Sequence, residues 1–247
     1  MGVSLFINGK TIEINEFTKD FLGGIEELEK IIQKPMLGVV PYFHLDIEDE
    51  DSLTDRFQKK VSSNTKLDVA VIRLPRIANF TDFNALRINH QINLRYVDSI
   101  SNLEEPGLLI IPGSKNTIED LIFLKQSGLA SKIKQLAKNN VPIFGICAGL
   151  QMLGTTIHDP HQIESKNKKE NGLELIDLNT TIESKKTTLQ VSNIIHYDQG
   201  LFEGLKGTIV KGYEIHMGSS VFKEGDSFLK TENKIIGIIK DNIIGTY

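Results

Sequence analysis

The sequence contains a single cysteine, Cys147, in a setting typical of a catalytic nucleophile. Gly145 and Gly149 flank it as Gly-x-Cys-x-Gly, the thiol counterpart of the Gly-x-Ser-x-Gly turn that exposes a nucleophile between a strand and a helix. Amide groups at the start of the following helix favour a thiolate, so we expect a lowered pKa for this thiol. The alternative is a buried cysteine that packs as a small hydrophobic residue.

A cysteine that attacks an amide also needs donors for the oxyanion that develops on the carbonyl oxygen. Residues 112–117 (PGSKNT) form a turn between a predicted strand and a predicted helix, and we expect the amides of Gly113 and Ser114 to be free to point into a cleft there. The turn fits an ordinary helix cap equally well. The second donor expected from the geometry of the elbow is the amide of Ala148.

A base for the thiol is harder to find among the six histidines. His216, in GYEIHMG, is the best placed by pattern, with an ordinary strand histidine as the alternative. His158 and His161 do not suggest a metal pair, because Pro160 opposes a helix that would align them. The acidic run at 46–51 (DIEDED) is typical of a solvated linker. We therefore expect no metal ligands.

The elements around the cysteine predict an α/β fold from residue 66 onward. Apolar strands are expected in LDVAVIRLP (67–75), GLLIIPG (107–113) and VPIFGI (141–146), with one or two helices between residues 117 and 139, broken near Gly128. Short strands separated by helices imply a mostly parallel sheet covered on both faces. Ligands bind beyond the carboxyl ends of such strands, where Gly113 and Cys147 fall. Later alternating segments, TTLQVS and TIVKGYEIHMG, predict strands of a less regular second half.

The first 60 residues differ in character from the rest. Residues 1–20 predict a hairpin or an irregular arm, and a helix from residue 25 (IEELEKIIQK) precedes a strand-like MLGVV at 36–40. This unit is too small to form a core alone, so we expect it to expose apolar surface and therefore to show self-association or local disorder. We place the domain boundary in the acidic linker, between a unit at 1–60 and a domain at 66–247.

Composition limits the classes of function. The chain has 247 residues, 40% hydrophobic residues and a net charge of −4, which disfavours a general nucleic-acid or membrane-surface binder. One cysteine cannot form an internal disulfide, and apolar runs stay well short of the roughly 20 residues of a membrane span. We expect a cytoplasmic protein that acts on a small molecule or binds a protein partner.

Four motifs in order carry a resemblance: RLPRIANFTDFNAL (73–86), LIIPGSKNTIEDL (109–121), GICAGLQMLG (145–154) and GYEIHMG (212–218). Together they closely resemble the glutamine amidotransferase domain of the cobyric acid synthase family, the CobB/CobQ type, and the likeness runs from residue 66 to the end. The resemblance implies the flavodoxin-like architecture of class I amidotransferases. Residues 25–42 resemble the final helix and strand of that family's ATP-binding domain.

The resemblance also implies an activity. Members of this family draw ammonia from glutamine and pass it to ATP-activated carboxylates of a corrin ring, converting cobyrinic acid a,c-diamide to cobyric acid in cobalamin biosynthesis. Cys147 would form the γ-glutamyl thioester, Gly113 and Ala148 would supply the oxyanion donors, and Gln151 would help to hold glutamine. ATP and Mg²⁺ would serve the ATP-binding domain, through which the corrin would bind, so no cofactor is expected in this chain.

Two departures from the family pattern set further expectations. The family's Gly-rich phosphate loop is not found in this sequence, and its catalytic histidine follows a Gly-Thr-Tyr that here is residues 245–247. We therefore expect a domain truncated at both ends, with little glutaminase turnover unless His216 replaces that histidine. The alternatives are a catalytically silent module that binds glutamine or a partner, and an amidotransferase subunit for peptidoglycan precursor amidation. The RLPRIANFTDF stretch argues against the latter.

Overall fold

The computed structural model describes residues 3–7, 10–14, 20–35, 67–230 and 235–247. The chain divides into two units, residues 1–48 and 49–247, which are considered separately. The predicted strand at 36–40 and the acidic run at 46–51 lie outside the described residues, so the placement of the domain boundary stays a prediction. None of the helices in these described ranges has both the length and the apolar character needed to cross a membrane.

The first unit contains a hairpin and a helix. Strands β1 (Val3–Ile7) and β2 (Lys10–Ile14) pair antiparallel, which confirms the hairpin rather than the irregular arm. Helix α1 (Asp20–Ile32) begins five residues before the predicted start at 25, through two glycines that weaken a helix but do not prevent one. The side chain of Ile31 is 75% exposed. Self-association through the apolar surface of this unit stays a prediction.

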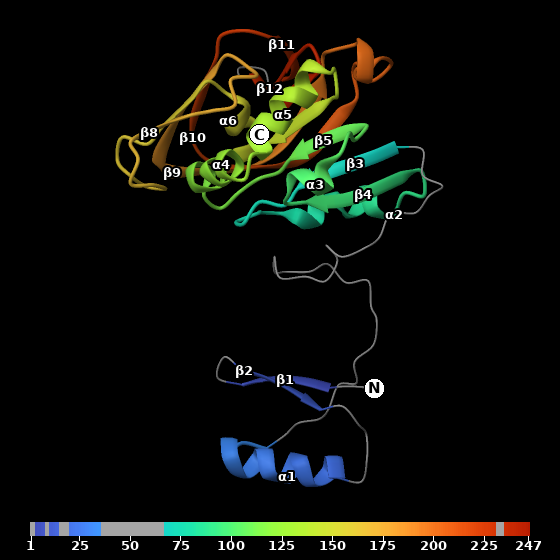
Figure 1. The fold of residues 1–247 in the computed structure, drawn as a ribbon, viewed down its shortest axis with the longest axis vertical. Coiled ribbons are helices and arrows are strands. Elements are labelled where there is room, and N and C mark those ends of the chain that lie inside the picture. The colour runs from blue at the N-terminus through green and yellow to red at the C-terminus, as the bar shows by residue number, and fades with distance from the viewer. Residues whose placement is uncertain (1–2, 8–9, 15–19, 36–66, 231–234) are drawn as a thin grey trace. The chain divides into compact units, whose positions relative to one another are not determined.

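The second unit is built on a sheet of 11 strands in the described residues (Figure 1). Its first half is parallel, in the order β4 (Ile92–Val97), β3 (Leu67–Ile72), β5 (Leu108–Ile111), β6 (Ile143–Ile146) and β13 (Ile243–Thr246). Strands β3, β5, β6 and β13 are short, apolar and rich in isoleucine and valine, as expected for strands that are covered on both faces, whereas β4 lies at the edge of the sheet and carries Asn93 and Arg95. The predicted α/β sheet is confirmed.

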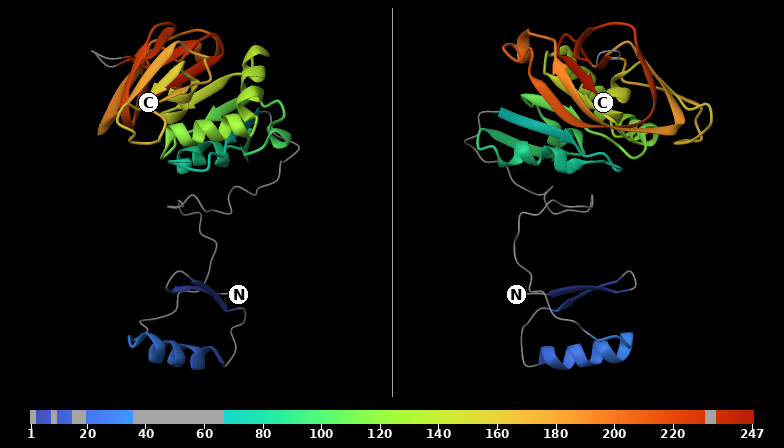
Figure 2. Two further views of the ribbon diagram at one scale, coloured as in Figure 1. Left: turned by 60° about the vertical axis from the view of Figure 1, so that its left-hand side comes forward. Right: turned by 180° about the vertical axis from the view of Figure 1, so that it is seen from behind.

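The second half of the sheet is mainly antiparallel. It continues through β12 (Ile235–Lys240), β11 (Asp226–Lys230), β9 (Leu178–Ile195), β7 (Thr156–His158) and β8 (Lys169–Asn171), and β10 (Ile209–Phe222) pairs with β9. Strands β9 and β10 form a long ribbon, seen from two further sides in Figure 2. A β-bulge between Met217 and Ser219 interrupts their register, with Gly218 at φ 82°. This half is the less regular one, as predicted.

Helices cover both faces of the parallel half. On one face α4 (Thr117–Gln126), α5 (Leu129–Lys138) and α6 (Ala148–Leu153) pack against Leu109, Ile111 and Ile143. On the other face the 3₁₀ turn η2 (Phe80–Phe83) and α2 (Asn84–Ile88) cover Val69, Val71 and Ile110. Two short elements, α3 (Ile100–Leu103) and η3 (Gly200–Phe202), complete the described structure. The predicted helical region is two helices, broken where Gly128 adopts φ 78°.

Candidate active site

Cys147 lies on the turn between β6 and α6, as predicted. Its φ of 54° and ψ of −108° are unusual for a residue other than glycine, and such strain persists where the surroundings impose it. The flanking glycines show what imposes it. A Cβ added at Gly149 would lie 1.9 Å from the carbonyl oxygen of Ile111, and one at Gly145 would lie 2.7 Å from the backbone of Gly149. The Gly-x-Cys-x-Gly pattern is therefore a steric requirement of the elbow against β5.

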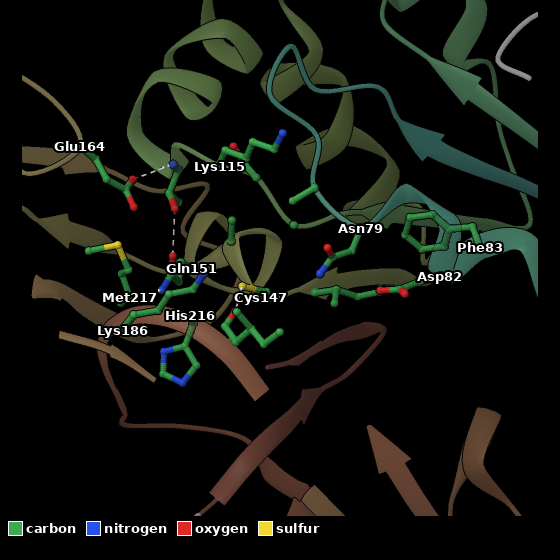
Figure 3. A pocket seen from close by; sticks show the side chains of 17 residues that line it. Asn79, Asp82, Phe83, Lys115, Cys147, Gln151, Glu164, Lys186, His216 and Met217 are labelled. Atoms are coloured by element: carbon green, nitrogen blue, oxygen red, sulfur yellow. Dashed lines mark hydrogen bonds between the residues drawn. The ribbon is translucent and has the colours of Figure 1, made fainter. Parts of the chain in front are cut away.

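The cysteine lines a pocket of about 360 Å³ (Figure 3). The loops after β3, β5 and β6 form much of its wall, and β10 contributes Ile215, His216 and Met217. Its polar lining includes the side chains of Asn79, Asp82, Lys115, Glu164, Lys186 and His216. Figure 3 shows Glu164, Gln151 and Met217 on one side of Cys147, and Asn79, Asp82 and Phe83 on the other.

The turn after β5 brings Gly113 to the cysteine. A Cβ added at Gly113 would lie 3.9 Å from the Cβ of Cys147. The carbonyl of Gly113 accepts a hydrogen bond from the amide of Ala78 at 2.9 Å, which fixes this turn against the loop after β3. The amide of Ala148 hydrogen-bonds the cysteine and lowers its thiol pKa. The structure thus gathers Cys147, Gly113 and Ala148 in one place, while their catalytic roles stay predictions.

A buried carboxylate links the two loops. Asp120, fully buried on α4, accepts hydrogen bonds from the backbone amide of Arg76 at 3.1 Å, from its Nη1 at 3.0 Å and from the hydroxyl of Ser114 at 2.6 Å. Buried carboxylates are stable only when they are hydrogen-bonded in this way. Asp120 therefore joins RLPRIANFTDF to the PGSKNT turn.

The predicted lowering of the thiol pKa is wrong for the unliganded site. Burial raises the pKa of Cys147 to about 11, and the carboxylates of Glu164 and Glu214 add to the effect. The hydrogen bond from Ala148 and the charge of Lys186 act in the opposite direction but do not outweigh burial. The thiol donates a hydrogen bond to the carbonyl of Ile215 at 3.2 Å. The cysteine is therefore protonated at neutral pH before substrate binds.

Gln151 lines the pocket beside the cysteine but is engaged by the protein itself. Its side chain is 2% exposed, and Oε1 accepts a hydrogen bond from the hydroxyl of Thr117 at 3.1 Å. Its Nε2 donates to the carbonyl of Met217 at 3.2 Å and to the hydroxyl of Tyr247 at 3.4 Å. These contacts fix its orientation, and the predicted contact with glutamine stays a prediction.

His216 reaches the pocket without presenting a base to the thiol. Its ring stacks on Tyr247 at a centroid distance of 3.8 Å, and its Nδ1 donates to the carbonyl of Gly218 at 3.0 Å. Its Nε2 lies 2.8 Å from Oε1 of Glu214. Both ring nitrogens therefore face partners other than Cys147. This arrangement supports the interpretation of His216 as a strand histidine with a structural role.

Glu164 lines the pocket although no pattern in the sequence predicts it as a site residue. Asp159, fully buried, accepts hydrogen bonds from the backbone amides of Ile163, Glu164 and Ser165 at 2.8, 2.8 and 3.1 Å, and so shapes this loop. Oε2 of Glu164 then accepts from the amide of Thr117 at 2.6 Å. Burial raises the pKa of the Glu164 carboxyl. The Asp-Pro turn was the one available signal, and it predicts a loop rather than a pocket residue.

The two histidines at this loop have different surroundings. His158 Nε2 shares a hydrogen bond of 3.3 Å with the hydroxyl of Thr156, and His161 is exposed. Within the described ranges, the side chains of His, Cys, Asp and Glu form no group of three or more that could hold a metal ion.

Comparisons with known proteins agree on one family. The chain matches the family described as CobB/CobQ-like glutamine amidotransferase domain over residues 68–247. Cobyric acid synthase of Clostridium acetobutylicum is 46% identical over 243 residues, which cover 95% of this chain and 47% of that protein. Cobyric acid synthase of Listeria monocytogenes is 40% identical over an alignment of 252 residues, which covers 96% of this chain and 48% of that protein. The chain thus spans about half the length of these curated relatives.

Solved structures agree on the fold. PurLQS from Thermotoga maritima superposes with a TM-score of 0.57 at 20% identity, covering 74% of this chain and 86% of that one. A structure described as a glutamine amidotransferase gives a TM-score of 0.53 at 14% identity, covering 72% and 87%. Identities this low show the fold alone. The family match and the identity to the curated relatives show more: the chain belongs to the CobB/CobQ-like glutamine amidotransferase family, the amidotransferase family of the cobyric acid synthases.

Proposed function

We propose that this domain releases ammonia from glutamine through a thioester on Cys147. The observation that carries the proposal is the strained elbow itself, which places the thiol beside Gly113 and Ala148 in a pocket of about 360 Å³. A strained nucleophile with backbone amides around it suits acyl transfer, in which a negative charge develops on the carbonyl oxygen. The resemblance of the four motifs assigns the same roles.

The reaction then follows from ordinary acyl-transfer chemistry. The Cys147 thiol loses its proton, and the sulfur attacks the side-chain carbonyl carbon of glutamine. The resulting oxyanion accepts hydrogen bonds from the amides of Gly113 and Ala148. The C–N bond breaks, and the nitrogen takes up a proton and leaves as ammonia. Water hydrolyses the thioester, which gives glutamate and restores the thiol.

The described residues around the thiol leave the role of base to a group outside them. We propose that a histidine following Gly-Thr-Tyr, where the family places one, takes the thiol proton. The geometry supports this, because the carbonyl of Thr246 accepts a hydrogen bond from the amide of Cys147 at 2.8 Å and Tyr247 contacts Gln151. A residue shortly after Tyr247 would therefore enter beside the pocket.

For the whole protein we propose the reaction of the relatives by name, cobyric acid synthesis. The ammonia would amidate ATP-activated corrin carboxylates, with ATP and Mg²⁺ bound by the half of the relatives that this chain does not cover, and we expect this in the cytoplasm. The peptidoglycan alternative is not favoured, because relatives of 40–46% identity carry the name cobyric acid synthase. An experiment distinguishes a catalytically silent module, which binds glutamine or a partner without turnover, from an active amidotransferase domain.

The experiment is to trap the thioester. The chain is mixed with glutamine and quenched in acid, and the peptide that contains Cys147 is weighed by mass spectrometry. We expect a glutamyl adduct on Cys147 and none in Cys147→Ser. Glutamate release is measured in parallel for the wild type and for His216→Gln, and we expect the same slow rate for both. The same trapping experiment is repeated with the chain extended past Tyr247 by the proposed histidine-containing segment. Glutamine binding by calorimetry without any adduct in either chain would identify a silent module and refute the proposal.

A further inference from the structure

Tyr247 leaves the sheet directly beside the cysteine. Strands β6 and β13 pair in parallel with Ile146 opposite Thr246, so Cys147 and Tyr247 are the next residues at the same carboxyl edge. The carbonyl of Thr246 accepts a hydrogen bond from the amide of Cys147 at 2.8 Å. A residue that follows Tyr247 therefore starts from a backbone tied to the elbow, and each residue extends the chain by only about 3.3–3.6 Å. The orientation of Tyr247 sets the direction in which the next side chains enter.

Three other elements hold Tyr247. Its amide donates a hydrogen bond to the carbonyl of Ile236 on β12 at 3.1 Å. Its hydroxyl shares a hydrogen bond with the hydroxyl of Ser220 on β10 and accepts one from Nε2 of Gln151 on α6 at 3.4 Å. Contacts at the hydroxyl alone leave the ring free to turn about its long axis. The ring plane is fixed by His216, whose own ring stacks on it at a centroid distance of 3.8 Å and an interplanar angle of 25°.

The ring of His216 is itself fixed in place. Glu214 and His216 lie two positions apart on β10, so their side chains share one face of the strand. Nε2 of His216 lies 2.8 Å from Oε1 of Glu214, and Nδ1 donates to the carbonyl of Gly218, in the β-bulge, at 3.0 Å. Both residues are buried, at 5% and 3% exposed, where a polar group is stable only with such partners. Figure 3 shows the ring turned away from Cys147.

We infer that His216 is a positioning residue: its ring, held by Glu214 and Gly218, orients Tyr247 and through it the base that follows Tyr247. The inference rests on the proposed function, which places a histidine there. A displacement of about 1 Å of a catalytic group can cost 10²-fold in rate, so such a residue affects turnover more than binding. The competing roles for His216 are the base itself and a packing residue without influence on the chemistry.

The test compares two chains, the 247-residue chain and the chain extended past Tyr247 by the histidine-containing segment. Glutamate release gives kcat and KM for the wild type and His216→Gln. His90→Gln is the matched control, because His90 is exposed on the turn before β4. In the extended chain His216→Gln should lower kcat about 10- to 100-fold and leave KM within about 2-fold. In the 247-residue chain the same substitution should leave the slow release unchanged.

Two further variants of the extended chain separate the competing roles. Glu214→Gln combined with His216→Phe keeps an aromatic ring and leaves no buried carboxylate without its partner. Its kcat should rise about 2- to 10-fold above that of His216→Gln, the scale of an aromatic pair, whereas phenylalanine cannot replace a base. In a Tyr247→Ala background, adding His216→Gln should change kcat by about 2-fold at most, because the residue through which it acts is gone. Urea unfolding midpoints establish that each variant is folded.

Three outcomes would overturn the inference. Equal kcat for the wild type and His216→Gln in the extended chain would show that the stack positions nothing, and the proposed function would stand. An equal loss in both chains would show that His216 acts on Cys147 without Tyr247 as intermediary. An extended chain no faster than the 247-residue chain would remove the proposed base and the inference together, while a glutamyl adduct on Cys147 would still support the thioester.

Discussion

The thiol pKa offers a direct test of how the environment of Cys147 acts. Its value of about 11 lies two units above the ordinary 9.0. At pH 8 about 0.1% of the thiol is then ionised, against about 10% for an unperturbed cysteine, a difference of about 2.7 kcal/mol. Because a thiolate of higher pKa is also more nucleophilic, the rate at one pH understates this difference. The pH midpoint of the reaction is the reliable quantity.

The assay is alkylation by iodoacetamide from pH 7 to 11.5, followed by intact mass. We expect the rate to rise about tenfold per pH unit and to level off near pH 11 for the folded chain, and near pH 9 after unfolding in urea. Cys147→Ser gives the background. The signs of the neighbouring charges provide a second check: Glu164→Gln should lower the midpoint and Lys186→Gln should raise it.

A folded-state midpoint below pH 9 would refute the reasoning. It would show that the amide of Ala148 and the start of α6 outweigh burial, as expected from the sequence alone. A midpoint near 11 that is the same in Glu164→Gln and Lys186→Gln would agree with burial as the cause of the raised pKa. It would contradict the electrostatic contributions of Glu164 and Lys186.

Three further predictions concern stability. Gly149→Ala should lower the free energy of unfolding in urea by about 3 kcal/mol or prevent folding, because its Cβ would overlap the backbone of Ile111; an unchanged urea midpoint would contradict the tight elbow. Asp120→Asn should cost about 1–3 kcal/mol in the same assay through its lost bonds to Arg76, whereas an effect below 0.5 kcal/mol would show that water replaces them. Burial raises the pKa of Tyr247 to about 12, so its contribution to stability is complete below pH 10 and is lost as pH rises toward 12. Urea unfolding of Tyr247→Phe should therefore show a smaller loss over that range than the wild type, and parallel curves would contradict this.

The sequence predicts the elbow and the parallel strands because their signals are local. Strands β3, β5 and β6 are apolar runs bounded by turn residues, and Gly145 and Gly149 mark a backbone that tolerates no Cβ. Gly128 marks the helix break because the backbone there adopts a positive φ, which glycine favours. Such features need only the residues within a few positions, so periodicity and turn chemistry suffice.

The charges and contacts of the site depend on segments that are far apart in the sequence. Local sequence patterns therefore do not predict them. The thiol is buried against Ile215, 68 positions away along the chain, so no signal near Cys147 indicates its raised pKa. Glu164 enters the pocket only because Asp159 shapes its loop. His216 is a candidate base by its local pattern alone, but Glu214 and Gly218 occupy its two ring nitrogens.

The position of β13 in the sheet has a consequence for how the protein is made. Residues 243–246 fill the gap between β6 and β12, and Ile143 pairs with Ile243 across about 100 positions of chain. Contacts between residues so far apart in the sequence are slow to form. During synthesis they cannot form until the ribosome has released the later strand, β13. Since the amide of Cys147 bonds to the carbonyl of Thr246, the reactive elbow closes only when that strand inserts. A nascent chain halted before residue 243 would carry the nucleophile on an open sheet edge, a state prone to aggregation and dependent on chaperones.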